Sequence, residues 1–382
     1  MKNTISITQQ CNLRCDYCYI DKHDAVMSAE TAARVIDFIY ANSPPGERIE
    51  IGLFGGEPLT AFAMVRHCTE LVKNHAAYDP KRVSLSLVTN GTIFTEEIAG
   101  FLQAHDITFC LSCDGPPAIH DRFRRFPDGR GSSALIENTL RQALDQLPAV
   151  LVNTVYSPET LPHLPEVVDY FISFGLRKIY VNANFRAHWT ARDAAFLPEV
   201  FSRLAERYCA MQLAGDPCFI SIIDGKLAVI LKKGYAPRER CRMGRGEYAF
   251  TPSGRIFPCE RLIGADNESS HCIGTVFSGI DPQALGCQPR SDSTNQECTD
   301  CSLRQYCMHW CGCSNFFSTG RYDRVGPFLC ASEQAAISTA HTVFESLSQR
   351  LGASFFDRML NGGCSRKEVA MSQERGPPRL AV

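Results

Sequence analysis

The sequence contains no long apolar run and no strong excess of charge of either sign. No stretch approaches the roughly 18 apolar residues that a membrane span requires, and the first residues, MKNTISITQQ, lack the apolar core of a secretory signal. The 39 Lys and Arg residues and 41 Asp and Glu residues give a net charge of −2, which provides no basic surface for nucleic acid or an anionic membrane. These absences predict a cytoplasmic protein that binds neither nucleic acid nor a membrane.

Cysteine is too sparse for a fold built on disulfides. The chain has 19 cysteines among 382 residues, about 5%, below the roughly 8–10% typical of short disulfide-built proteins. At roughly 150 residues per domain, this length predicts two or three domains with conventional cores. An odd number of cysteines, an unexported start and C-x2-C spacings favour reduced thiols that bind metal.

Short β-branched runs alternate with amphipathic stretches through the first half of the chain. The runs predict strands at 4–8, 49–54, 83–89, 107–113, 149–156 and 178–183. The amphipathic stretches predict helices at about 28–42, 60–76, 95–104, 131–146, 160–174 and 194–213. This alternation indicates an α/β fold with a parallel sheet and right-handed crossovers. Ligands bind at the carboxyl ends of such strands, so we expect the polar segments that follow them to line one site.

The pattern changes near residue 215. A short helical stretch at 224–233 leads into a cysteine-rich segment with strand-turn units such as Tyr248–Cys259. A last helix is predicted at about 331–350, and the polar tail after it is predicted to be poorly ordered. The predicted domains are an α/β domain at 1–213, a helical bridge at 214–240, a cysteine-rich domain at 241–335, a C-terminal helix at 336–360 and a tail at 361–382.

Cys11, Cys15 and Cys18 form a C-x3-C-x2-C motif directly after the first predicted strand. Three thiolates on one loop can hold three corners of a 4Fe-4S cluster, which leaves the fourth iron open to another ligand. Zinc is the alternative, but a structural zinc site needs a fourth protein ligand, for which His23 is the nearest candidate. Tyr17 precedes the third cysteine, where its ring could pack against a bound ligand.

This cysteine loop and the Gly55-Gly56-Glu57-Pro58 segment after the second strand resemble the radical S-adenosylmethionine enzymes over roughly residues 1–210. The resemblance implies a partial, TIM-like (β/α)6 barrel in which the open iron chelates the amino and carboxylate groups of S-adenosylmethionine. It also implies that the Gly-Gly-Glu segment binds the amino group, and that reductive cleavage yields a 5′-deoxyadenosyl radical. Glycines let backbone approach a ligand closely, and Glu57 offers an anion to an ammonium. The alternative is a tight turn, whose chemistry Gly-Gly and Glu-Pro also fit.

Other polar residues near strand ends resemble positions of the peptide-modifying members of this family. The resemblance implies that Ser112 contacts S-adenosylmethionine and that Arg124 grips its carboxylate with a planar guanidinium. The alternative for Arg124 is a solvated arginine, and Asn153 could instead satisfy neighbouring backbone. The cofactor-binding positions expected are Tyr17, Gly55, Gly56, Glu57, Asn90, Ser112, Asp114, Arg124 and Asn153.

The C-terminal cysteines resemble the SPASM extension of the same family over about 235–335. The resemblance implies one auxiliary 4Fe-4S cluster on Cys298, Cys301, Cys307 and Cys330, and another on Cys241, Cys259 and Cys311. Glu247 stands where sulfatase maturases have a further cysteine, so the latter cluster has either an open iron or a fourth ligand such as Cys313 or Glu247. Together with the first loop, three 4Fe-4S clusters are expected. The alternative for C-x2-C-x5-C-x3-C is a zinc ribbon.

The resemblance implies an enzyme that takes hydrogen from a peptide or protein. Our leading hypothesis is a maturase of ribosomally made peptides that forms a cross-link such as a thioether. The alternatives are a sulfatase maturase that oxidises Ser or Cys to formylglycine, and a non-catalytic iron-sulfur or zinc module. Glu260 directly follows Cys259 and is the candidate base, and its alternative is a surface glutamate paired with Arg261.

Two protein partners are expected beside the substrate. One is an external one-electron reductant of the flavodoxin or ferredoxin type. The other depends on the substrate: because the barrel is predicted to begin at residue 4, a leader peptide would be recognised by a separate protein or by the SPASM surface.

Overall fold

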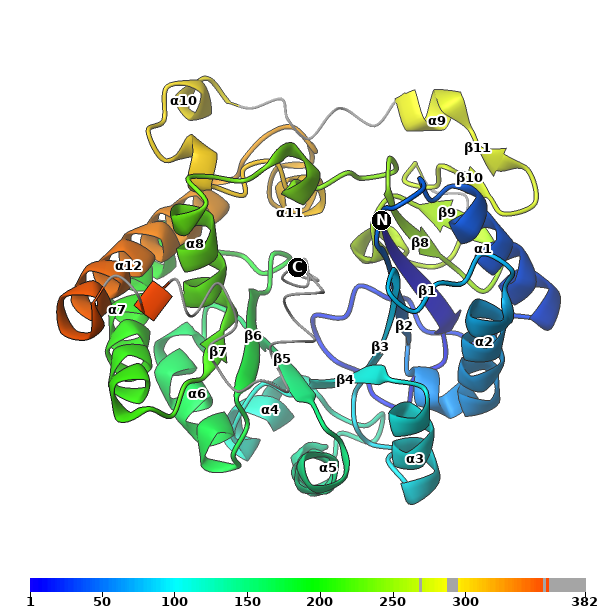
Figure 1. Cartoon of the computed structure of the whole chain (residues 1–382), viewed down its shortest axis with the longest axis horizontal. Coiled ribbons are helices and arrows are strands. Elements are labelled where there is room, and N and C mark those ends of the chain that lie inside the picture. The colour runs from blue at the N-terminus through cyan, green and yellow to red at the C-terminus, as the bar shows by residue number, and fades with distance from the viewer. Residues whose placement is uncertain (268–269, 287–294, 353–354, 357–382) are drawn as a thin grey trace. The chain divides into compact units, whose positions relative to one another are not determined.

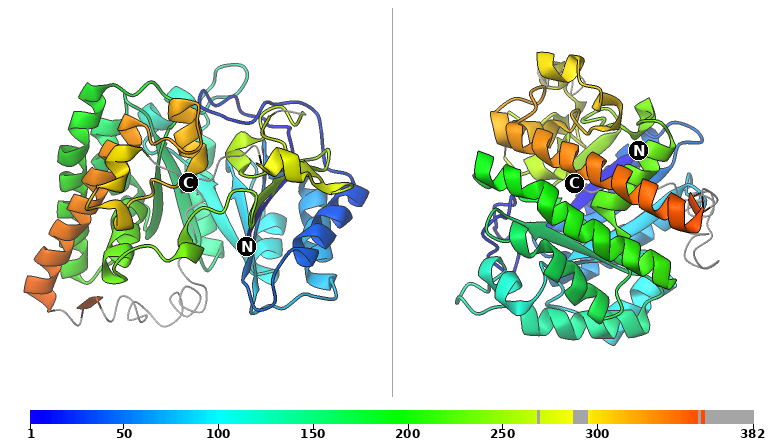
Figure 2. Two further views of the ribbon diagram at one scale, coloured as in Figure 1. Left: turned by 90° about the horizontal axis from the view of Figure 1, so that it is seen from above. Right: turned by 90° about the vertical axis from the view of Figure 1, so that its left-hand side faces the viewer.

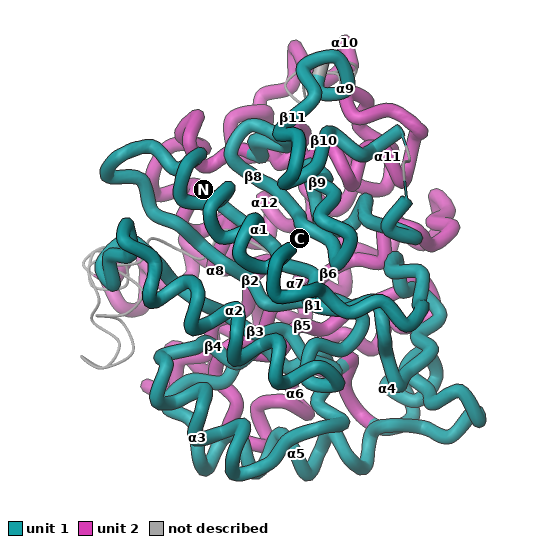
Figure 3. The backbone as a smooth tube through the Cα atoms, turned by 90° about the vertical axis from the view of Figure 1, so that its right-hand side faces the viewer, with its two compact units in different colours: residues 1–113, 117–150, 241–291 teal, residues 114–116, 151–240, 292–382 magenta. Residues whose placement is uncertain are grey.

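The computed structural model describes residues 1–267, 270–286, 295–352 and 355–356. The chain forms two compact units, which Figure 3 shows in two colours. Unit 1 comprises residues 1–113, 117–150 and 241–291, and unit 2 comprises residues 114–116, 151–240 and 292–382. Each unit thus contains residues from both the α/β half and the cysteine-rich half of the chain. The predicted domains, in contrast, are consecutive segments of the sequence, and their bounds stay a prediction. The predicted tail at 361–382 lies outside the described residues.

A parallel sheet forms the centre of unit 1, because its strands carry apolar and β-branched side chains that pack well on a pleated surface. Ile5, Leu53, Leu87 and Phe109 pair in register across it and are fully buried. The strands, in spatial order, are β1 (Lys2–Thr8), β2 (Ile49–Gly55), β3 (Val83–Thr89) and β4 (Ile107–Ser112). Its main helices are α1 (Ala29–Ala41), α2 (Phe62–Asn74), α3 (Glu96–Ala104), α4 (Pro117–Phe123) and α5 (Ser133–Gln146). Figure 1 shows α1 and α2 along the outer side of β1 and β2.

The cysteine-rich segment extends this sheet beyond β1. Strand β8 (Glu247–Phe250) pairs parallel with β1, and Ile5 lies opposite Phe250. The sheet continues antiparallel through β9 (Arg255–Phe257), β10 (Gly274–Thr275) and β11 (Gly279–Ile280), and α9 (Pro282–Gly286) follows. Without β8, strand β1 would expose a row of unpaired N–H and C=O groups. Cys241 and Cys259 therefore belong to the same unit as the first cysteine loop.

Three parallel strands of the sheet belong to unit 2. Its strands are β5 (Val150–Tyr156), β6 (Lys178–Ala183) and β7 (Phe219–Ile220). Its helices are α6 (Leu164–Ser173), α7 (Ala191–Ala214), α8 (Ser221–Leu231), α10 (Gln296–Thr299), α11 (Gly312–Thr319) and α12 (Pro327–Leu351). The long helices α7 and α12 lie side by side (Figure 2). Thr190 and Asp193 cap the start of α7 reciprocally, and Gly215 ends it in the left-handed conformation.

The predicted α/β class is confirmed, and each predicted strand and helix of the first half is present within a few residues of its expected bounds. The sequence pattern did not reveal α4, β7, or the pairing of β8 with β1. Among the helices of the described residues, none is long and apolar enough to cross a membrane.

Candidate active site

The cysteine loop leaves the carboxyl end of β1 and is fixed by backbone hydrogen bonds. Cys11, Cys15 and Cys18 are half-buried, and none forms a disulfide. The N–H of Cys18 donates to the carbonyl of Cys15 at 3.2 Å, and the N–H of Leu13 donates to Cys11 Sγ at 3.4 Å. The pKa of Cys11 is raised to about 11, mainly by burial and to a smaller extent by nearby Glu57 and Cys15. An unligated Cys11 is therefore a thiol near neutral pH, and metal binding would release its proton.

The two glycines after β2 bring that strand's tip against the segment that leads into the cysteine loop. The N–H of Gly56 donates to Thr8 O at 2.8 Å, and the N–H of Glu57 donates to Gln10 O at 2.7 Å. A Cβ on Gly55, whose φ is +142°, would lie 2.3 Å from Thr8 O, and one on Gly56 would lie 2.1 Å from Gln10 O. The close approach that only glycine permits is thus made to the chain's own backbone. A role of these glycines in cofactor binding stays a prediction.

Replacing Gly56 with alanine should destabilise the site, because the new Cβ would collide with backbone atoms. Unlike the end of a flexible side chain, these atoms cannot move aside at low cost. We expect the free energy of unfolding to fall by about 1–3 kcal/mol, as for other overpacked positions, and the retained iron to fall with it. Urea unfolding and iron analysis measure both. Gly100 in α3 is the matched control, because a Cβ there meets nothing within 4 Å, and alanine at a helix interior stabilises by roughly 0.5–1 kcal/mol. Equal stability of wild type and Gly56→Ala would contradict this interpretation.

Glu57 is completely buried and joins the tips of β2 and β3. Its Oε1 accepts from Leu59 N–H at 3.0 Å and from Thr89 Oγ1 at 2.7 Å, and its Oε2 accepts from Asn90 N–H at 2.6 Å. Burial raises the pKa of Glu57 to about 7, although these donors favour the ionised form. Asn90 in turn donates from Nδ2 to Cys11 Sγ at 3.8 Å. The carboxylate therefore positions the strand tips around the cysteine loop, while its contact with an ammonium stays a prediction.

Arg124 is buried rather than solvated, with 7% of its surface exposed. Its guanidinium carbon lies 5.3 Å from the centre of the Tyr17 ring, a cation–π geometry, and Tyr17 also packs against Phe123 with ring centres 5.8 Å apart. The structure thus brings these two predicted cofactor-binding residues together on unit 1. Ser112, at the end of β4, is half-buried in the same unit.

Asp114 and Asn153 belong to unit 2. Asp114 is buried, and its Oδ1 accepts from Val155 N–H at 3.0 Å, so it fixes the backbone of β5. Asn153 is half-buried on β5 opposite Tyr180 of β6. Their contact with a cofactor stays a prediction.

The cysteines predicted to hold one auxiliary cluster all belong to unit 2. Cys298, Cys301 and Cys330 interact with one another electrostatically, and burial raises the pKa of Cys298 and of Cys330. Burial also raises the pKa of Cys307, which faces Glu333 and Lys226.

Cys311 is part of the predicted second auxiliary cluster and belongs to unit 2 as well. It is buried at the start of α11, with its Sγ 3.8 Å from Cys313 Sγ and 3.2 Å from Ser314 Oγ. Cys313 is therefore close enough to Cys311 to stay a candidate fourth ligand.

The candidate base Glu260 is buried in unit 1, where Lys2 is its partner. Lys2 Nζ lies 3.6 Å from Glu260 Oε1, and Thr4 Oγ1 lies 3.4 Å from Oε2. Burial is the largest contribution and raises the pKa of Glu260, but Lys2, a backbone hydrogen bond and Arg261 together lower it more, so the net shift is downward. The alternative of a surface glutamate is wrong, because Glu260 is buried and only 9% of its surface is exposed. Sequence reasoning missed Lys2, and no local signal could have found a partner 258 positions away along the chain.

No three His, Cys, Asp or Glu side chains in the described ranges converge as the ligands of a single metal ion would. Iron-sulfur ligands each bind a different iron of the cluster, so they stand farther apart than ligands of one ion.

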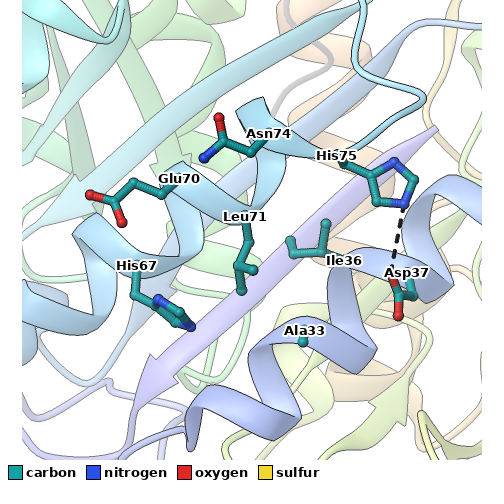
Figure 4. A pocket seen from close by; sticks show the side chains of 8 residues that line it. All are labelled: Ala33, Ile36, Asp37, His67, Glu70, Leu71, Asn74 and His75. Atoms are coloured by element: carbon teal, nitrogen blue, oxygen red, sulfur yellow. Dashed lines mark ion pairs between the residues drawn. The ribbon is translucent and has the colours of Figure 1, made fainter.

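A pocket of about 340 Å³ lies between α1 and α2, away from the cysteine loop (Figure 4). His75 Nε2 lies 3.6 Å from Asp37 Oδ1 at one end of it, and the lining also includes His67 and Glu70. None of the predicted site residues lines this pocket.

Comparison with known proteins decides the family. The profile described as Radical SAM superfamily matches residues 5–171. An uncharacterised protein of Methanocaldococcus jannaschii is 30% identical over 293 residues, which cover 72% of this chain and 89% of that protein. The chain belongs to the radical SAM superfamily. It is therefore an enzyme, and the alternative of a non-catalytic module is wrong.

More distant relatives of this radical SAM enzyme include a cyclopropyl synthase and a sulfatase-maturating enzyme. The radical SAM cyclopropyl synthase TigE of Paramaledivibacter caminithermalis is 23% identical and covers 80% of this chain and 66% of its own. The serine-type anaerobic sulfatase-maturating enzyme of Klebsiella aerogenes is 24% identical and covers 79% of this chain and 76% of its own.

Solved structures share the fold. The structure of anSMEcpe with bound AdoMet and the Cp18Cys peptide superposes with a TM-score of 0.75 at 19% identity and covers 92% of this chain and 99% of its own. Streptococcus suis SuiB bound to precursor peptide SuiA superposes with a TM-score of 0.60 at 17% identity and covers 86% of this chain and 75% of its own.

Proposed function

We propose that this enzyme is a maturase that cleaves S-adenosylmethionine and takes a hydrogen atom from a ribosomally made peptide, leading to a cross-link such as a thioether. The observation that carries the proposal is the cysteine loop, which the glycines after β2 and the Glu57–Asn90 contact hold at the tips of β2 and β3. A 4Fe-4S cluster on Cys11, Cys15 and Cys18 would supply the electron that cleaves the sulfonium. The peptides bound in the structures of anSMEcpe and SuiB support the substrate class.

The residues around the loop fit a cluster that binds a zwitterionic ligand. The three thiols are half-buried, and the ring of Tyr17, the residue before Cys18, contacts the buried cation Arg124. In the proposal Arg124 binds the carboxylate of S-adenosylmethionine, because a guanidinium matches a carboxylate with two parallel hydrogen bonds. Tyr17 orients that guanidinium through its ring. The auxiliary clusters proposed on the C-terminal cysteines would accept an electron from the substrate, and an external flavodoxin or ferredoxin would supply the first one.

Anaerobic reconstitution tests this function. The chain is loaded with iron and sulfide, reduced with dithionite and given S-adenosylmethionine, and the products are separated by liquid chromatography with mass detection. We expect 5′-deoxyadenosine and methionine. Their absence from a chain whose iron content shows loaded clusters would overturn the proposal.

A sulfatase maturase is the second candidate, because Glu260 follows Cys259 and because sulfatase-maturating relatives match most of the chain. The two reactions leave different products. Formylglycine is an aldehyde that reacts with hydrazines, whereas a thioether consumes a cysteine thiol and forms no carbonyl. Peptides containing Ser or Cys, treated with the enzyme and probed with a hydrazine and with iodoacetamide, therefore distinguish the candidates.

Glu260 is the base of this proposal, so Glu260→Gln should abolish product formation while 5′-deoxyadenosine still forms. Glutamine keeps the shape of the side chain but cannot accept a proton. Lys2 provides a second readout, because its ammonium lowers the pKa of Glu260. Removing it in Lys2→Met should raise that pKa and move the acidic limb of the pH–rate profile to higher pH. Wild-type turnover by Glu260→Gln would exclude Glu260 as the base.

A further inference from the structure

Glu247 begins β8 at the position where the sulfatase-maturase pattern has a cysteine, and its side chain contacts Cys241. The distance between Glu247 Oε2 and Cys241 Sγ is 3.4 Å. Both side chains are half-buried. The carboxylate thus lies beside one of the sulfurs that the auxiliary cluster is expected to use.

The strand pairing places a cation beside Glu247. Lys2 of β1 lies in register with Glu247 on β8 and with Glu50 on β2, so these three side chains leave the same face of the sheet. The Lys2 ammonium interacts electrostatically with Glu260, Glu247, Cys259 and Glu50. Cys259 and Glu247, the residue that contacts Cys241, therefore interact with the same ammonium within unit 1.

Charge distinguishes the two carboxylates that flank Lys2. A cysteine that binds iron is a thiolate, and a thiolate and a carboxylate 3.4 Å apart repel each other unless a cation lies between them. Glu247 is in this position with respect to Cys241. Glu50 interacts with the same ammonium, and Glu247 in addition contacts Cys241.

We propose that Glu247 is an oxygen ligand of the auxiliary cluster held by Cys241 and Cys259, in place of the absent cysteine. The inference rests on the proposed function, because it requires that the chain hold an auxiliary iron-sulfur cluster. Carboxylate is a harder ligand than thiolate, and the irons of such clusters prefer thiolates. A thiolate, whether added or carried by a cysteine of the substrate, should therefore displace Glu247. In this proposal Glu247 occupies the iron when no substrate is bound, and a substrate thiolate replaces it.

The test uses the full chain with Cys11, Cys15 and Cys18 replaced by alanine, so that only auxiliary clusters contribute to the spectra. Iron and sulfide content and the electron paramagnetic resonance spectrum of the reduced protein are measured with and without 2-mercaptoethanol. In this triple variant, which is the background and keeps Glu247, the added thiol should change the spectrum. Glu247→Ala should change it before any thiol is added, and Glu247→Cys should give a spectrum that added thiol no longer alters. Glu50→Ala is the matched control and should behave as the background does.

The inference is overturned if Glu247→Ala and Glu247→Cys, at full iron content, both give the spectrum of the background with and without thiol. Such a result would favour Cys313 as the fourth ligand. It is also overturned if the background holds no iron. In either case, formation of 5′-deoxyadenosine by the chain with its first loop intact shows whether the proposed function survives.

Discussion

Replacing Cys15 with alanine should reduce the formation of 5′-deoxyadenosine to background. Three thiolates leave one iron of a 4Fe-4S cluster open for S-adenosylmethionine, and a loop with two thiolates would hold the cluster poorly or leave a second iron without a protein ligand. Cys15 is half-buried, so its truncation opens only a small cavity and should leave the fold intact. The measurement is 5′-deoxyadenosine per chain under dithionite, and Cys11→Ala and Cys18→Ala should give the same result.

Cys209→Ala is the matched control for this experiment. Cys209 is a half-buried cysteine on α7, outside every predicted cluster, and should keep wild-type activity when it is truncated. Circular dichroism of both variants separates loss of fold from loss of chemistry. Substantial 5′-deoxyadenosine from Cys15→Ala would mean that another group completes the site, which would contradict the assignment of the loop.

The sequence was sufficient for the strands and helices of the first half because each carries a local signal. Runs such as TISIT in β1 and VSLSLVT in β3 alternate with amphipathic helices, and local hydrophobic periodicity is the strongest structural signal in a single sequence. The cysteine loop and the glycines after β2 were found for the same reason, since motif and spacing are contiguous there. The pairing of β8 with β1 was not found, because it joins residues that are about 245 positions apart in sequence.

The roles of the site residues depended on partners that lie far away along the chain. Glu57 was expected to offer its carboxylate to a ligand, and the structure gives both oxygens to donors, one of them the N–H of Asn90 directly after the neighbouring strand β3. For Glu260 the alternative was pairing with the adjacent Arg261, and the structure adds Lys2, far away along the chain, as an ion-pair partner. Residue type and spacing therefore indicated candidate carboxylates, but only the fold shows which donors and cations contact each of them.

Replacing Lys226 with methionine should destabilise unit 2 strongly. Lys226 on α8 and Glu333 on α12 form a buried ion pair, with 5% and 7% of their surfaces exposed and 2.6 Å between Nζ and Oε2. Removing one partner of such a pair leaves an uncompensated buried charge, which costs about 3–5 kcal/mol. Urea unfolding measures the loss. Lys232→Met, which breaks the more exposed pair with Glu239, is the control and should cost at most about 1 kcal/mol.

The same ion pair also fixes the backbone on both sides of a predicted cluster ligand. Lys226 Nζ donates to the carbonyl of Tyr306 at 3.0 Å, and the N–H of Met308 donates to Glu333 Oε2, so the pair holds Cys307 between them. The double variant Lys226→Met/Glu333→Leu removes both charges and should recover most of the lost stability, because a buried pair can be replaced by apolar side chains at little cost. It should nevertheless retain less iron than wild type, because neither hydrogen bond to the backbone beside Cys307 remains. If the double variant is as stable as wild type and also retains full iron, then the pair serves the core of unit 2 and not the position of Cys307.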